Sequence, residues 1–483
     1  MNRIFSPSGE GWPDFPRRSF GKLDQIEPID PTNASQAVFC LDVVDADWAA
    51  FATGGRFDLG NPVALQASVS DYWNLLFKKI IPPLDPYDNA PIYRIEITSS
   101  RGDPWFDELL TLDEEEWVLV VLNDTGPFEV DVYGSMLGAA VTAHLVRIER
   151  NIPESAALNV AFSPHSWPDA TEPQLRNALA GLPRLEYLIG LDVGQGTAVG
   201  LADANEDIHL YFDLGGGVYR NAKTRPNPLM FCWRVDTPIV LSHWDSDHWA
   251  GEITDPQAQP RTWIAPRQSM TKKHMAFANR ILRGGATLLV WGSAPSSISV
   301  AVTGGQTLEL RRCIPVKPKN RNGSGIAGIV DDPSSGSQWL LTGDAGYSEI
   351  GTLPAAPVAT VVPHHGADMG SKGSPPARPA AYSRLFYSFG PGNRHGRHPG
   401  VQHPTVAAMT AHAAWNHGTW TGAVPGHSLA GNDVLASATH PGSHLSGVVM
   451  GWSHAPAVPL SSFTCATSGA SAACTCSSTI TQA

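Results

Sequence analysis

The hydrophobic pattern of the first 150 residues predicts a separate domain of strands and helices. Three apolar runs are typical of β-strands: 37–44, 92–98 and 117–122. Helical spacing in 69–79, and small and apolar positions through 132–147, predict helices. We therefore expect a smaller α/β domain over residues 1–150.

A second domain is predicted to begin after a proline-rich linker at 151–185. Beyond it, strands at 188–201 are separated by a glycine turn, and a further strand ends in Asp213 and three glycines. This domain is expected to span 186–460. The Ser-, Thr- and Cys-rich tail, 461–483, has too little apolar content to offset the entropy of ordering, so disorder is expected there.

Residues 237–251 combine an apolar strand with four side chains that can bind a metal. The donors follow the strand closely: His243, Asp245, Asp247 and His248. Burying two imidazoles and two carboxylates without partners would cost several kcal/mol, and a divalent cation can compensate all four. The loop therefore predicts a metal site.

Two later strands end in further potential ligands. One ends on Asp344, and the other ends on His364 and His365, of which one is expected to bind. Together with the loop donors, these side chains could hold two divalent cations about 4 Å apart, bridged by a carboxylate and by water or hydroxide. As a member of this set, Asp344 is expected to be the bridging carboxylate.

Seven short motifs occur in an order that is similar to one known superfamily. They are GLDVGQG (190–196), YFDLG (211–215), SHWDSDHWAG (242–251), NRNGS (320–324), QWLLTGDA (338–345), VVPHHG (361–366) and YSFGPGNR (387–394), with a later His-Pro. Over roughly 186–455 the chain resembles the metallo-β-lactamase-fold hydrolases, and most closely their ComEC-type branch, named for a competence DNA-uptake protein. Asp245 matches that branch, which has aspartate where most of the superfamily has histidine. Thr197 departs from it, because the branch has aspartate there.

The resemblance implies a fold and an activity. The expected fold class is α/β, with an αββα metallo-β-lactamase sandwich preceded by the smaller α/β domain. The expected activity is metal-dependent hydrolysis by a two-metal phosphodiesterase or nuclease that uses a metal-bridging hydroxide. Asp245 makes the ligand set oxygen-rich, which admits Mn²⁺ beside Zn²⁺ as the two divalent ions.

The resemblance also assigns roles to individual residues. Asp213 and Asp192 would orient the metal ligands without binding the metal. Asp247 would be essential for catalysis, and His403 would contact substrate phosphate or stabilise developing charge. His398 competes with His403 for this role. Asn393, with Arg394 beside it, could bind an anion.

Composition limits the remaining possibilities. A chain of 483 residues favours two domains, and a net charge of −12 argues against non-specific coating of nucleic acid. We find no N-terminal signal segment and no apolar run of membrane-spanning length, so a cytoplasmic protein without membrane contact is expected. Cys40, Cys232 and Cys313 are expected to be buried thiols rather than parts of a disulfide framework.

Two other functions remain open at this stage. One is a metallohydrolase that acts on a small-molecule ester, amide or cyclic nucleotide, which the acidic charge balance favours. The other is a non-catalytic interaction protein that binds a protein partner through residues 1–150 and uses the metal only for stability. A nucleic acid or nucleotide substrate remains the leading expectation.

Overall fold

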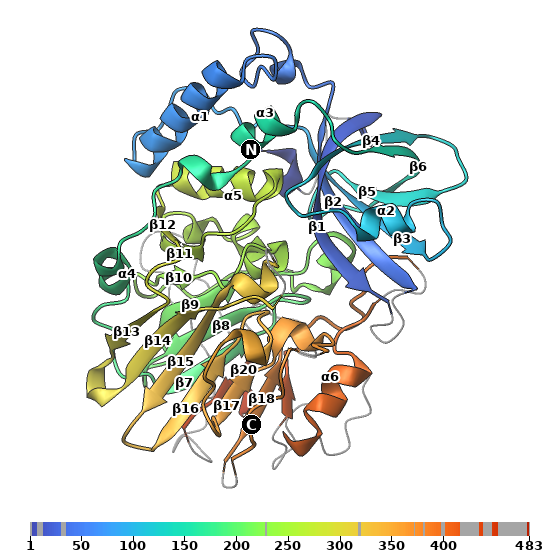
Figure 1. Cartoon of the computed structure of the whole chain (residues 1–483). Coiled ribbons are helices and arrows are strands. Elements are labelled where there is room, and N and C mark those ends of the chain that lie inside the picture. The colour runs from blue at the N-terminus through green and yellow to red at the C-terminus, as the bar shows by residue number, and fades with distance from the viewer. Residues whose placement is uncertain are drawn as a thin grey trace. The chain divides into compact units, whose positions relative to one another are not determined.

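The computed structural model divides into two compact units (Figure 1). It describes residues 2–6, 13–29, 35–227, 229–316, 320–370, 372–379, 382–397, 401–415, 434–437, 447–452 and 481–482. The barrel unit comprises Met1–Pro168, Ser269–Gly285 and Arg394–Val401. The two-sheet unit comprises Asp169–Gln268, Ala286–Asn393 and Gln402–Ala483.

Six antiparallel strands form a closed barrel in the first unit. In barrel order they are β1 (Arg18–Pro28), β2 (Gln36–Asp45), β3 (Ile92–Ser100), β5 (Glu129–Tyr133), β6 (Val141–Glu149) and β4 (Trp117–Asn123). Its helices are α1 (Pro62–Phe77), α2 (Phe106–Leu110), α3 (Ser155–Ala161) and α5 (Lys272–Arg283). Alternate side chains such as Phe39, Leu41 and Ile95 fill a common core.

The barrel corrects the predicted α/β class of the first domain. The strands at 37–44, 92–98 and 117–122 are confirmed, and the helix at 69–79 is confirmed as the second half of α1. The helix at 132–147 is wrong, because β5 ends at Tyr133 and β6 begins at Val141. Exposed and less exposed positions alternate through much of β6, and valines and threonine favour a strand there.

Helix α5 belongs to the barrel unit although its sequence lies between two strands of the other unit. The Lys273 ammonium lies 2.5 Å from the Asp24 carboxylate and 3.3 Å from that of Asp42, and all three side chains are buried. Lys272 donates a hydrogen bond to the backbone oxygen of Asp42 at 2.5 Å. These buried ion pairs hold α5 against β1 and β2, because removing either partner would leave an uncompensated charge.

Two sheets build the second unit. The eight-stranded sheet has the order β12 (Thr287–Trp291), β11 (Thr262–Pro266), β10 (Ile239–Val240), β9 (Ile208–Leu214), β8 (Ala198–Ala202), β7 (Tyr187–Leu191), β20 (Gly447–Met450) and β21 (Thr481–Gln482). The seven-stranded sheet has the order β13 (Ser297–Ala301), β14 (Thr307–Arg312), β15 (Ile326–Asp332), β16 (Ser337–Leu341), β17 (Ala359–Val361), β18 (Arg384–Tyr387) and β19 (Val434–Ala436). One hydrophobic core contains side chains of both sheets, so they pack face to face.

The two-sheet unit is not an αββα sandwich, and that prediction is wrong. Its described α-helices are α4 (Glu172–Ala178) and α6 (Val406–Ala411), which are too short to cover the outer faces of two broad sheets. The longer helix between β11 and β12 is α5, and it packs in the barrel unit instead. Within the described ranges, no helix has the length and apolar content needed to cross a bilayer.

The predicted burial of the three cysteines outside the tail is confirmed. Cys40, Cys232 and Cys313 are buried free thiols. Burial raises the pKa of Cys313 to about 12, so this thiol stays protonated and unreactive at neutral pH.

Gly190 allows the two sheets to approach closely. A Cβ atom at this position of β7 would lie 2.2 Å from the ring of Phe386 in β18. We predict that Gly190→Ala lowers the free energy of unfolding by about 1–3 kcal/mol, because the core must shift to accept the methyl group. Urea unfolding followed by tryptophan fluorescence measures this.

A double-mutant cycle with Phe386→Leu tests the cause. The cost of Gly190→Ala should fall in the Phe386→Leu background, since the shorter side chain leaves room for the methyl group. If the two substitutions change the free energy of unfolding additively, contact with the Phe386 ring is not the reason that glycine is needed at position 190.

Candidate metal centre

The candidate centre lies where parallel strands of both sheets end. In the eight-stranded sheet, β9 and β10 run parallel; in the other, β16, β17 and β18 do. Parallel strands bring their carboxyl ends to one edge, and the donors follow those ends. The loop after β10 carries four donors, Asp344 follows β16, and His364 and His365 follow β17. The structure therefore brings together all seven predicted metal ligands.

Asp344 lies at the centre of the group. Its Oδ1 lies 3.1 Å from His248 Nε2, and its Oδ2 lies 3.6 Å from His243 Nε2 and 3.7 Å from His364 Nε2. The two oxygens thus face different imidazoles. A carboxylate placed in this way could bind two cations at once, and its bridging role stays a prediction.

Asp247 and His365 complete the side of the centre next to His248. His365 Nε2 lies 3.1 Å from Asp247 Oδ2 and 4.0 Å from Asp344 Oδ2, while His248 Nε2 lies 4.0 Å from Asp247 Oδ1. Metal–ligand bonds of about 2.0–2.2 Å in a tetrahedral site separate the donors by roughly 3.4 Å. The observed separations are close to this value without an ion between them.

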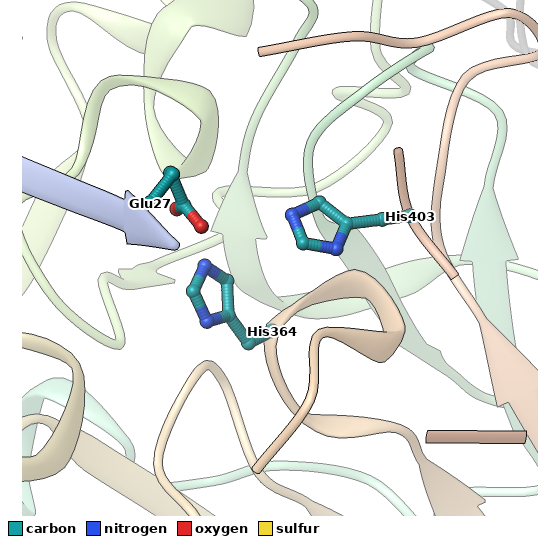
Figure 2. Close-up of side chains that lie close together, drawn as sticks. All are labelled: Glu27, His364 and His403. Carbon is teal, nitrogen blue, oxygen red and sulfur yellow. The ribbon is translucent and has the colours of Figure 1, made fainter. Parts of the chain in front are cut away.

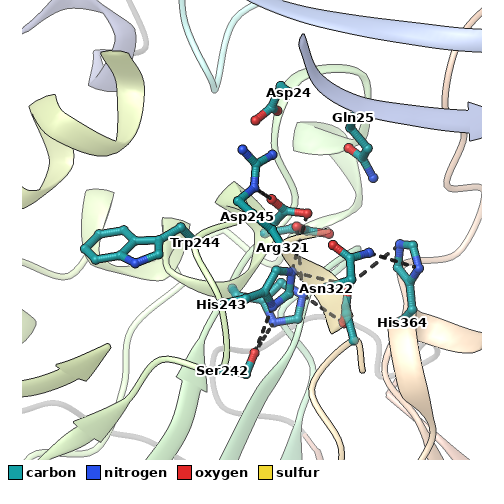
Figure 3. Close-up of polar contacts among 12 residues, drawn as sticks. Asp24, Gln25, Ser242, His243, Trp244, Asp245, Arg321, Asn322 and His364 are labelled. Atoms are coloured by element: carbon teal, nitrogen blue, oxygen red, sulfur yellow. Dashed lines mark hydrogen bonds and ion pairs between the residues drawn. The ribbon is translucent and has the colours of Figure 1, made fainter. Parts of the chain in front are cut away.

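Hydrogen bonds behind the imidazoles fix which nitrogen faces the centre. His248 Nδ1–H donates to Asp213 at 2.8 Å, and His365 Nδ1–H donates to the Ser388 carbonyl at 2.8 Å. Ser242 Oγ lies 3.0 Å from His243 Nδ1 (Figure 3). The same hydroxyl donates to Asp213 at 2.8 Å. With Nδ1 engaged in this way, each Nε2 faces the centre, as in metal-binding histidines.

Buried polar atoms at the centre are left without hydrogen bonds. Among the described residues, four such donor atoms occur here: the Nε2 atoms of His243, His248 and His365, and Oδ1 of Asp344. Unsatisfied buried groups of this kind are costly in a folded protein. Since they face one another, one or two divalent cations would satisfy them, and the residues present fit such ions.

The turn that presents His364 and His365 is backbone-strained. The φ angles of His364, His365 and Gly366 are +48°, +54° and +83°, and only glycine adopts such values without cost. His365 is buried, whereas His364 keeps 15% of its side chain exposed and its Nδ1 lies 3.4 Å from the Asn322 amide nitrogen. Of the two, His365 has the geometry of an anchored ligand.

Electrostatic coupling keeps the carboxylates charged. Burial opposes the charge on Asp344, but the imidazoles of His248, His364 and His243 outweigh it and hold its pKa well below the usual range. Burial likewise opposes protonation of His248, yet the carboxylates of Asp344 and Asp213 raise its pKa well above the ordinary value. In the absence of metal, a proton on His248 takes the place that a cation would fill.

His403 and Asn393, two further predicted site residues, are hydrogen-bonded to each other. His403 is buried and its ring lies 5.5 Å from that of His364, centroid to centroid (Figure 2). Asn393 binds the His403 backbone, with the amide nitrogen donating to the His403 carbonyl at 2.5 Å and its oxygen accepting from the His403 N–H at 2.8 Å. It therefore positions a histidine here, and no anion is needed to explain its burial.

Three other predicted positions lie outside the ligand group. Asp192 accepts a hydrogen bond from the Gly194 amide at 3.1 Å. Arg394 belongs to the barrel unit. His398 and the tail from 461 lie outside the described residues, apart from the strand Thr481–Gln482.

Sequence reasoning missed Ser242, Arg321 and Ser388. Arg321 is buried and its Nε lies 2.9 Å from Asp245 Oδ1 (Figure 3), while Ser242 links His243 to Asp213. Thr197, where the resembling branch has aspartate, has its hydroxyl 3.3 Å from His365 Nδ1. All three residues lie within quoted motifs, but serine and arginine are common in loops, and Asp213 and Asp245 lie 29 and 76 residues from Ser242 and Arg321.

Comparison with known proteins adds no relative. No model of a known protein family matches the sequence, and no curated protein does so either. The interpretation of the centre therefore depends on its own geometry.

Replacing Asp213 should weaken metal binding at the centre. We predict that Asp213→Asn lowers the affinity for Zn²⁺ by about 10- to 100-fold, because its NH₂ group cannot accept a hydrogen bond and must face either the Ser242 N–H or the Ser242 hydroxyl and His248 Nδ1–H. Competition with a chromophoric chelator measures the affinity. Asp203→Asn is the matched control, since Asp203 also pairs with a histidine of this unit, His209, at 3.2 Å. Equal affinity in wild type and Asp213→Asn would contradict the role.

Asp192 should make stability depend on pH. Burial raises its pKa from 3.8 to about 7, although the Gly194 amide opposes the shift. The folded state thus favours the protonated acid, and stability is lost as the pH rises from about 4 to 7. We predict that Asp192→Asn removes this loss, which is at most of the order of 4 kcal/mol at about 1.4 kcal/mol per pKa unit. Urea unfolding of both proteins at pH 5 and pH 8 measures the difference, and parallel pH profiles would contradict it.

Proposed function

We propose that the two-sheet unit is a metal-dependent hydrolase and that its substrate is a phosphodiester. The observation that supports this proposal is the set of buried, unbonded donor atoms of His243, His248, His365 and Asp344, which face one another. A purely structural role would leave these atoms as an unexplained cost, because folding normally satisfies buried polar groups.

Metal ions of the Zn²⁺ or Mn²⁺ type, when bound, lower the pKa of water and neutralise charge that grows on a phosphoryl group. The chain supplies the rest. Asp344 spaces the two positions, and Asp213, Ser242 and Ser388 fix the ring orientations before any ligand arrives. Such preorganisation lowers the reorganisation needed during the reaction.

The choice of phosphodiester depends on the order of the sequence motifs. That order resembles the ComEC-type branch, which is associated with DNA degradation, and paired cations suit displacement at phosphorus. His403, whose ring neighbours that of His364, is the candidate for contact with a substrate phosphate. Esters, amides and cyclic nucleotides are the alternative substrates against which this choice is tested.

Loss of a ligand should abolish hydrolysis. We predict that Asp247→Ala and His248→Ala lower phosphodiesterase activity by more than about 100-fold, since even groups behind the ligands typically contribute 10- to 100-fold. The assay uses bis(p-nitrophenyl) phosphate, linear DNA, RNA, a cyclic nucleotide and p-nitrophenyl acetate, each with Zn²⁺ or Mn²⁺.

His209→Ala is the control, because His209 also pairs with an aspartate but lies outside the donor set. It should keep full activity. Turnover retained in Asp247→Ala, or turnover of the acetate ester alone, would exclude the proposed phosphodiesterase.

A further inference from the structure

Two aspartates of the same loop have different electrostatic neighbours. Asp245 Oδ1 accepts a hydrogen bond from Arg321 Nε at 2.9 Å, and both side chains are at least nine-tenths buried. Asp247 faces the imidazoles of His365 and His248 instead. A guanidinium keeps its charge at any ordinary pH, so Asp245 has a permanent positive partner that Asp247 lacks within the described part of the chain.

The donor atoms also lie in two overlapping groups. Within each group the donor atoms lie within 4.8 Å of one another: Asp247, His248 and His365 form one group, and His243, His248 and Asp344 form the other. His248 is common to both groups, but its Nε2 can bind only one ion, because its Nδ1 is bonded to Asp213. Asp245 belongs to neither group, although its Oδ2 lies 3.4 Å from His243 Nε2. The carboxylate that should complete the position at His243 is thus held by Arg321.

Arg321 is fixed in place by its own surroundings. Its side chain is 3% exposed, and its backbone oxygen accepts a hydrogen bond from the Gln268 amide at 2.6 Å. A cation at Asp245 must therefore bind within reach of a positive charge that has little room to withdraw. Like charges close together in a poorly solvated site repel strongly.

We propose that Arg321 makes the two cation positions unequal. The position formed by Asp247, His248 and His365 fills first and holds its ion tightly. The position formed by His243 and Asp245 fills second and releases its ion readily. Arg321 repels an ion there and also binds one oxygen of the Asp245 carboxylate. The inference rests on the proposed function, and it makes the fully loaded state depend on the free metal concentration.

Titration of the full-length, metal-stripped protein with Zn²⁺ tests the inference. Chelator competition should resolve two binding steps whose affinities differ by about tenfold or more, an effect of the size that groups behind metal ligands produce. Two equal steps would overturn the inference.

Three variants show which residues are responsible for each binding step. Asp245→Asn should remove the second step and leave the first unchanged, whereas Asp247→Asn should weaken the first. Arg321→Met should tighten the second step by about tenfold, because it removes the charge and keeps a side chain of similar length. Arg267→Met is the matched control, since Arg267 pairs with Asp169 in the same unit and should alter neither step. A second step that weakens or stays the same in Arg321→Met would overturn the inference, as would a weakened first step in Asp245→Asn.

These outcomes are separate from those of the hydrolysis assay. Unequal steps without turnover of any phosphodiester would leave the inference standing and remove the proposed function. Phosphodiester turnover with two equal binding steps would support the proposed function and overturn the inference.

Discussion

The buried carboxylate of Asp213 organises the centre. It is fully shielded from solvent and accepts hydrogen bonds from the Ser242 amide at 2.6 Å, from the Ser242 hydroxyl at 2.8 Å and from His248 Nδ1 at 2.8 Å. An ionised carboxylate is stable in such a place only when its oxygens are satisfied in this way. The loop after β10 therefore has one favourable conformation, and that conformation points its imidazoles inward.

The imidazoles also have polar partners on the side that faces away from the centre. Each of His243, His248 and His365 has its Nδ1 beside an oxygen atom, and each leaves Nε2 for the centre. The strained turn at His364 and His365 continues into Gly366, where a Cβ atom would lie 2.6 Å from Pro404 and 2.9 Å from Tyr387. Backbone strain of this kind persists only where the surrounding structure holds it.

The sequence allowed the convergence of these side chains to be predicted better than the architecture. His243, Asp245, Asp247 and His248 are adjacent in one loop, and Asp344 ends an apolar run, so their convergence follows from strand patterning. Arg321 was missed because its partner Asp245 lies 76 residues away, and nothing local marks that pairing. The αββα expectation failed for a similar reason. The helix between β11 and β12 packs in the barrel unit, where its lysines bind Asp24 and Asp42, more than 200 residues earlier.

This long separation has a consequence for synthesis of the chain. Asp24 lies in β1 and its partner Lys273 lies 249 residues later, after most of the eight-stranded sheet has been made. At 5–20 residues per second, the ribosome needs on the order of 10–50 s to bridge that gap. During this time the early barrel strands carry two carboxylates whose lysine partners do not yet exist. These ion pairs therefore form only after α5, which is encoded between two strands of the other unit, has been synthesised.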